Sequence, residues 1–152
     1  MSRYATKEAT KQLQKLLDVL GEFGGVIETD DPSSYWSLDL EVEEIKGNVQ
    51  NIQIGVFSEL NGDIIYDPLF HLSLRCENGK IVETEILDCE ETTVFGTSVV
   101  DNEDFIHGFG LTEKDPYGLQ SRFSSFMTNM TERGPYLTNP KEVRRWYKTL
   151  VD

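Results

Sequence analysis

The sequence has little of what marks most enzymes and membrane proteins. It contains only two cysteines and two histidines, and no apolar run approaches the roughly 20 residues that a membrane-spanning helix needs. The start of the chain, MSRYATKEATKQLQK, lacks the apolar core of a signal peptide, so we expect a cytoplasmic protein with two free thiols. Zinc-ligand spacings, phosphate-binding loops and dinucleotide fingerprints are also absent from the sequence. These absences make an enzyme the less favoured class and predict no cofactor.

Basic residues are scarce as well. The chain has 14 Lys and Arg against 27 Asp and Glu, a net charge of −13. Residues 22–115 hold 22 acidic and 4 basic residues, a net of −18, whereas the two ends together carry +5. Direct nucleic-acid binding through this region is disfavoured, because it would bring phosphates against a negative field. Solubility alone would explain an acidic surface, but a negative centre also suits a basic partner.

The residues that are present predict an α+β fold in a single domain, residues 1–152. Residues 5–21 have the apolar spacing of an amphipathic helix. Alternating patterns between residues 35 and 100 predict an antiparallel β meander of about five to six strands. Residues 119–131 predict a helix, and Asn139 followed by Pro140 predicts the start of a last one. We expect the two C-terminal helices to pack on one face of the sheet and the other face to be open and acidic.

The segment HLSLRCENGKIVETEIL, residues 71–87, predicts a hairpin. A two-residue Asn-Gly loop would set core residues opposite charged ones, so the pattern favours a three-residue loop with a bulge at Gly79. Glu83 then lies opposite Ser73, and Glu85 lies opposite His71, on the solvent side. A His71–Glu85 pair suits a surface charge pair better than a catalytic base, since no nucleophile lies in register.

Rows of carboxylates are the main positive signal for function. Alternate residues on a strand lie about 6.8 Å apart, which is comparable to the spacing of phosphates along a nucleic-acid strand. Two such rows on neighbouring strands would suit a Lys/Arg groove built for phosphate. We therefore predict a small acidic protein that binds and inhibits a basic nucleic-acid-handling protein by mimicry. The predicted contacts are Asp39, Glu41, Glu43, Glu83, Glu85, Asp101, Glu103 and Asp104.

Two alternatives stay open at this point. The first is a metal-dependent hydrolase or nuclease that holds Mg²⁺ with the side chains around the NGDIIYD segment, namely Glu59, Asp63, Asp67 and His71. The second is a homodimer without a ligand, whose interface is formed by helical residues 119–130 and 144–150.

Three stretches carry a resemblance to a known group of proteins: GEFGGVIE at 21–28, SLDLEVEEI at 37–45 and NGDIIYDPLFHLSL at 61–74. In this order they resemble an uncharacterised domain of plasmids, conjugative elements and phages of Gram-positive bacteria. The likeness covers residues 5–90 and brings no catalytic residues with it. It implies a mobile genetic element and the character of an anti-CRISPR or anti-restriction factor, with a CRISPR effector or restriction enzyme as the partner.

Overall fold

The computed structural model describes residues 3–31, 35–60, 62–93, 96–101 and 118–147. Of residues 60, 63, 92, 93, 96–98, 100 and 101 it describes the backbone alone. The elements are α1 (Lys7–Leu20), β1 (Gly24–Glu28), β2 (Ser37–Lys46), β3 (Val49–Leu60), β4 (Asp63–Glu77), β5 (Lys80–Thr93), β6 (Gly96–Asp101), α3 (Leu119–Thr128), the π-helical turn η2 (Asn129–Arg133) and β7 (Glu142–Arg145).

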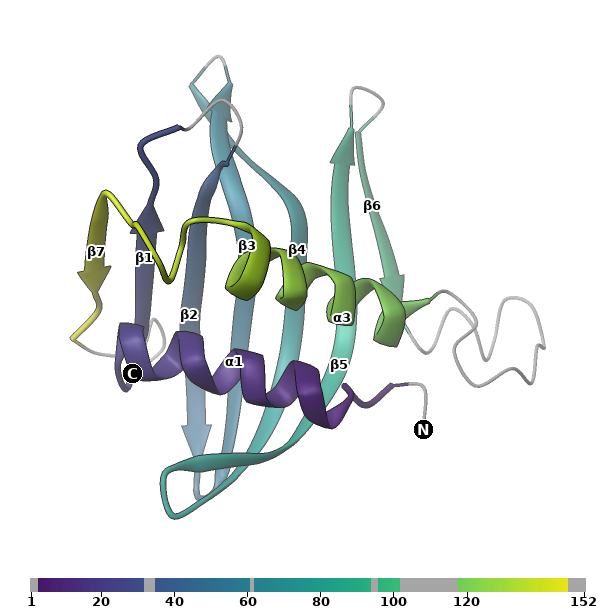
Figure 1. The fold of residues 1–152 in the computed structure, drawn as a ribbon. Coiled ribbons are helices and arrows are strands. Elements are labelled where there is room, and N and C mark those ends of the chain that lie inside the picture. The colour runs from purple at the N-terminus through teal and green to yellow at the C-terminus, as the bar shows by residue number, and fades with distance from the viewer. Residues whose placement is uncertain (1–2, 32–34, 61, 94–95, 102–117, 148–152) are drawn as a thin grey trace.

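The strands form one antiparallel sheet in the order β6-β5-β4-β3-β2-β1-β7, and α1 and α3 lie across the same face of it (Figure 1). The predicted α+β fold with an antiparallel meander is thus confirmed, and the described residues form seven strands instead of five or six. We call the sheet face away from α1 and α3 the open face, since no described helix covers it. No helix within the described ranges has the length and apolar character that crossing a membrane requires.

The N-terminal helix forms where its apolar spacing predicts. Thr6 caps it, because the Thr6 hydroxyl oxygen accepts a hydrogen bond from the Ala9 backbone N–H at 3.1 Å. Leu13, Leu16 and Leu20 are fully buried against the sheet. Gly21 ends the helix with φ at 92°, a conformation that glycine adopts without steric cost.

The core lies between the two helices and the inner face of the sheet. Its apolar layer on the strands comes from alternate positions, such as Leu38, Leu40 and Val42 on β2. Phe70 on β4 contacts α3 through two aromatic rings, with centroid distances of 5.2 Å to Phe123 and 5.3 Å to Phe126. This burial fixes which sheet face is left to solvent.

The predicted last helix is wrong, because residues 142–145 form strand β7, which pairs antiparallel with β1. Gly25 allows the close approach of the two strands, since a Cβ atom at this position would collide with the Arg144 carbonyl oxygen. Val143 turns toward the core, and Arg144 on the opposite face binds Glu28 at 2.9 Å. In the homodimer alternative, the predicted interface helix at residues 144–150 is therefore wrong at residues 144 and 145, which belong to β7.

The predicted three-residue hairpin loop is also wrong. Asn78 and Gly79 form a two-residue turn with positive φ at both positions, and Glu77 pairs with Lys80. The conflict between core and charged residues is resolved by a bulge within β5, where Cys76 pairs with Ile81 but Arg75 pairs with Glu83. The extra residue, Val82, is exposed. The bulge keeps Glu83 and Glu85 on the open face, as predicted, although their partners differ.

Candidate functional site

Strand β5 carries a line of four carboxylates along the open face: Glu83, Glu85, Asp88 and Glu90. Their partners on β4 are Arg75, Ser73, His71 and Leu69, which alternate with the inward-facing residues of that strand. A second bulge between Glu85 and Asp88 keeps all four acids on one face. Glu83 and Glu85 lie about 6.8 Å apart along the strand, and so do Asp88 and Glu90. The sequence predicts only Glu83 and Glu85 as contacts on this strand, so the row is longer than predicted.

Some acidic side chains of the open face form ion pairs with basic residues, and others do not. Glu85 binds Arg3 at 3.2 Å, and Glu44 binds Lys46 at 3.1 Å. Among the described residues, no ion pair reaches Glu43, Glu83 or Glu90. These three acids therefore make no ion pair of their own there, although Glu83 interacts electrostatically with Arg3, and Glu43 and Glu90 with His71.

Asp39 does not behave as the predicted surface contact. Its position on β2 does face the open side, but its exposed fraction is 2%. The Tyr66 hydroxyl donates a hydrogen bond to Asp39 Oδ2 at 3.0 Å, while Oδ1 is buried without a partner among the described residues. Burial, reinforced by the negative charge of Glu41, raises the pKa of Asp39 to about 7. Asp39 is thus too buried to contact a partner directly.

The burial of Asp39 has a local cause in the neighbouring strands. Gly55 on β3 stands beside Asp39, and Leu69 on β4 stands on the other side of Gly55. Because Gly55 has no side chain, Leu69 and the Pro68 carbonyl oxygen pack directly against it, and Tyr66 reaches Asp39 from β4 across β3. Val26 on β1 flanks the carboxyl group from the opposite side and is buried too.

Next to Asp39, two hydrogen-bonded pairs lie in one row across four strands. Glu41 pairs in register with Gln53, Gln53 with His71, and His71 with Asp88. Gln53 Nε2 donates to Glu41 Oε2 at 2.7 Å, and His71 Nδ1 lies 2.6 Å from Asp88 Oδ1. Burial and the charge of Glu43 raise the pKa of Glu41. The row presents hydrogen-bond acceptors and negative charge, which suit guanidinium and ammonium groups.

His71 gives this row a measurable pH response. The hydrogen bond to Asp88 raises the pKa of His71 above its usual 6.5, against the lowering effect of partial burial. The substitution Asp88→Asn should therefore lower the His71 pKa, as measured by NMR titration of the imidazole ring protons. Because the folded-state pKa is raised, the pair stabilises the fold below pH 6.5 and its contribution disappears as pH rises through the folded value. Glu59→Gln, which changes an exposed acid elsewhere, should leave the titration unchanged.

The structure describes the side chains of only some of the other predicted contacts. Glu41 and Glu43 are half-buried on β2, and Glu43 is the unpaired residue at a bulge between Val42 and Glu44. Asp101 ends β6, where only its backbone is described, and Glu103 and Asp104 lie outside the described residues. Three of the eight predicted contacts thus have no described side-chain position.

The residues of the metal-site alternative do not converge in the described part of the chain. His71 pairs with Asp88 on the open face, four residues or roughly 13 Å along β4 from Asp67. Glu59 is opposite Ile64, and the side chain of Asp63 is not described. No group of three or more His, Cys, Asp and Glu among the described residues could hold a metal ion.

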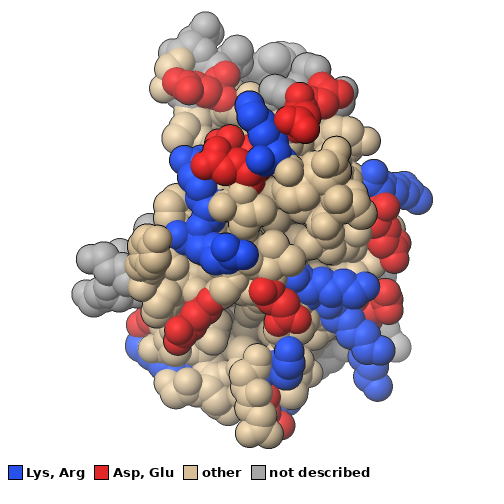
Figure 2. Space-filling view, turned by 60° about the vertical axis from the view of Figure 1, so that its left-hand side comes forward, with Lys and Arg blue, Asp and Glu red and all other residues tan. Residues whose placement is uncertain are grey.

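The edge of the molecule beside β7 has a different charge pattern. Blue and red side chains are interspersed over this side in Figure 2. Arg144 bridges Glu28 and Glu142 there, at 2.9 and 4.0 Å. This edge therefore carries charges of both signs, whereas the row on β5 is acidic.

Sequence reasoning missed Tyr66, Asp88 and Glu90 as members of the site. Asp88 and Glu90 had a detectable signal, since they continue the alternating acids of β5, but the intervening bulge hides their common face. No local signal marks Tyr66 as the partner of Asp39, because the two lie 27 positions apart. Comparison of the chain with protein-family models, curated proteins and solved structures found no match, so the interpretation of the site depends on its own geometry.

Proposed function

We propose that this protein is a binding module that docks the open face of its sheet onto a basic surface of a nucleic-acid-handling protein and inhibits it by occupying the phosphate-binding groove. The observation that carries the proposal is the line of four carboxylates on β5, on a face that no described helix covers. A groove that binds successive phosphates offers Lys and Arg side chains at a similar repeat. The partner class that we expect is a CRISPR effector or a restriction enzyme.

The physical basis of docking is charge complementarity. Glu43, Glu83 and Glu90 make no ion pair among the described residues, so ion pairs formed with a partner would offset their desolvation. Glu41 and Asp88, which already accept hydrogen bonds, extend the acceptor surface between β2 and β5. Asp39 contributes indirectly, because its protonation state sets the charge next to Glu41.

Charge reversal at two uncompensated acids tests the proposal. The double variant Glu83→Lys/Glu90→Lys should weaken binding by at least about tenfold, or about 1.4 kcal/mol, because attraction becomes repulsion at two positions. The assay is inhibition of DNA cleavage by a CRISPR effector nuclease and by a panel of restriction enzymes, with direct binding measured at low and high salt. Wild-type binding should weaken as salt screens the contact.

The matched control is Glu8→Lys/Glu132→Lys, which makes the same change in net charge at exposed acids of α1 and η2 on the helix side. This control should retain inhibition. Equal losses in both double variants would assign the effect to net charge, and binding that is indifferent to salt would argue against docking by the open face.

A further inference from the structure

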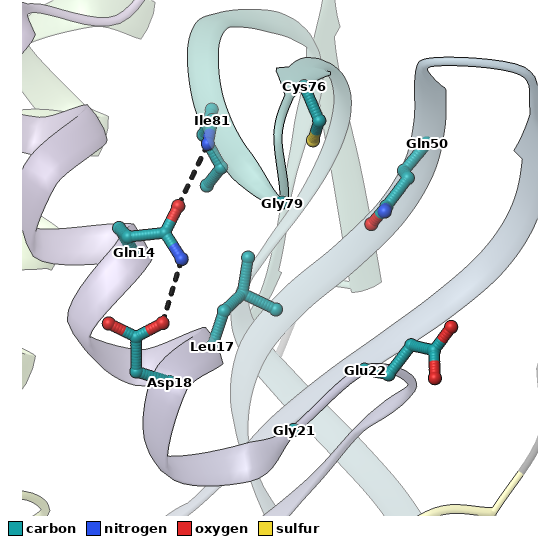
Figure 3. Close-up of a pocket in the computed structure, with 9 residues that line it drawn as sticks. All are labelled: Gln14, Leu17, Asp18, Gly21, Glu22, Gln50, Cys76, Gly79 and Ile81. Carbon is teal, nitrogen blue, oxygen red and sulfur yellow. Dashed lines mark hydrogen bonds between the residues drawn. The ribbon is translucent and has the colours of Figure 1, made fainter.

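A separate hollow of about 460 Å³ lies on the helix side, where the long strands β3, β4 and β5 extend past the C-terminal end of α1 (Figure 3). Leu17 and Ile81 give it an apolar wall, and Cys76 and Gln50 reach toward it from the strands. Gln14 braces one side, since its Oε1 accepts from the Ile81 N–H at 2.8 Å and its Nε2 donates to Asp18 at 2.9 Å. Hydrogen bonds thus fix the position of α1 relative to the β4–β5 hairpin on this side of the hollow.

The negative groups around this hollow are only partly paired with cations. The C-terminal end of a helix carries partial negative charge and is stabilised by Lys, Arg or His in the last turn. The last turn of α1 has no basic residue and instead has Asp18, with Glu22 just beyond the helix. Arg145 Nε binds the Val19 carbonyl oxygen at 2.9 Å, and Lys80 Nζ lies 3.6 Å from Asp18. No described cation pairs with Glu22.

Two polar groups in the hollow are also unused. Neither the Gln50 amide nor the Glu22 carboxylate makes a side-chain hydrogen bond among the described residues. An apolar wall with a few free polar groups is the usual composition of a small-ligand site, and the volume lies within the usual range. An alkyl chain suits Leu17 and Ile81, while Glu22 and the Gln50 amide oxygen suit an ammonium group at its end.

From this cavity and its charge we propose that the hollow binds a primary alkylammonium group, with the alkyl part on Leu17 and Ile81 and the ammonium on Glu22 and Gln50. The group could come from a free diamine or from a lysine side chain of another protein. This inference does not rest on docking by the open face, because the hollow lies on the opposite side of the sheet. Either proposal can fail without the other.

Cys76 provides a native reporter for the test. It is the more accessible of the two thiols, because Cys76 is partly exposed whereas Cys89 is buried. Burial raises the pKa of both thiols, that of Cys89 to about 12. The rate of Cys76 modification by N-ethylmaleimide is measured with increasing putrescine, with ionic strength held constant by sodium chloride. A ligand at ten times its Kd leaves about a tenth of the sites free, so we expect modification to slow by up to about tenfold and to saturate. Cys76→Ser confirms that the labelled thiol is Cys76.

Matched glutamate variants locate the effect. Glu22→Gln should remove at least most of the protection, whereas Glu8→Gln, which neutralises an exposed acid in the first turn of α1, should keep it. A parallel titration with lysine capped at both ends separates the two sources: protection by putrescine alone indicates a free amine, and protection by both indicates that a lysine side chain also fits. Absence of protection by either amine, or equal protection in both glutamate variants, would overturn the proposal.

Discussion

Replacing Asp39 with asparagine should make the protein more stable at neutral and alkaline pH. Asp39 has a folded-state pKa of about 7 against a usual value of 3.8, so the folded state holds a proton that the unfolded state releases. The contribution of Asp39 to stability is greatest below pH 3.8, where both states are protonated, falls between that pH and about 7, and is lost above about 7. At about 1.4 kcal/mol per pKa unit, the buried carboxylate costs roughly 4 kcal/mol above that range.

The measurement is the free energy of unfolding by urea at a series of pH values from about 4 to about 8. Asparagine keeps an oxygen that accepts from the Tyr66 hydroxyl, so Asp39→Asn should lie close to the wild type at acid pH and gain roughly 2–4 kcal/mol at pH 8. Asp30→Asn removes an exposed carboxylate and should leave the pH profile nearly parallel to that of the wild type. Parallel profiles for both variants would mean that Asp39 ionises normally in the folded protein.

The sequence predicts the elements whose apolar period is long and regular. The helix at residues 5–21 appears as Lys7–Leu20, because its leucines recur on one stripe over several turns. Likewise, the alternation at residues 35–45 appears as strand β2. In both segments the local pattern and the tertiary contacts agree, so a single sequence is sufficient.

The C-terminal error arises because the deciding contact is distant in sequence. Val143, Trp146 and Tyr147 have spacings that suit a helix, and Pro140 suits a helix start. The strand is selected by pairing with β1, more than 100 residues earlier, and by the absence of a side chain at Gly25. A period read over so few residues does not distinguish a short edge strand from a helix.

The sequence predicts which face of the sheet the candidate acids occupy, but it does not predict their burial or their neighbours. Alternation places Asp39, Glu41, Glu83 and Glu85 on the open face, and the register confirms that side for each of them. It does not predict that Asp39 is buried, because that depends on Gly55 and Tyr66 in other strands. Bulges also make the assignment of side chains to a face uncertain, since each extra residue shifts the alternation of the residues that follow it.

Replacing Phe70 with alanine should cause a large loss of stability, because Phe70 is among the largest fully buried side chains of the core. Phe70 is 1% exposed and contacts both Phe123 and Phe126, so the substitution leaves a cavity between β4 and α3. A buried Phe→Ala change costs about 3–5 kcal/mol, which is a large part of the stability of a domain of this size. Urea unfolding measures the loss, and amide hydrogen exchange across α3 should show it locally as faster exchange.

Phe57→Ala is the matched control, because Phe57 is half-buried on the open face and contacts Tyr66 at a centroid distance of 5.6 Å. Its loss should be smaller, about 1–2 kcal/mol, since solvent fills the space instead of a cavity forming. If the two variants lose equal stability, the aromatic contact with α3 is not what holds the helix on the sheet. A larger loss for Phe70 shows that its aromatic contacts with Phe123 and Phe126 contribute to holding α3 on the sheet.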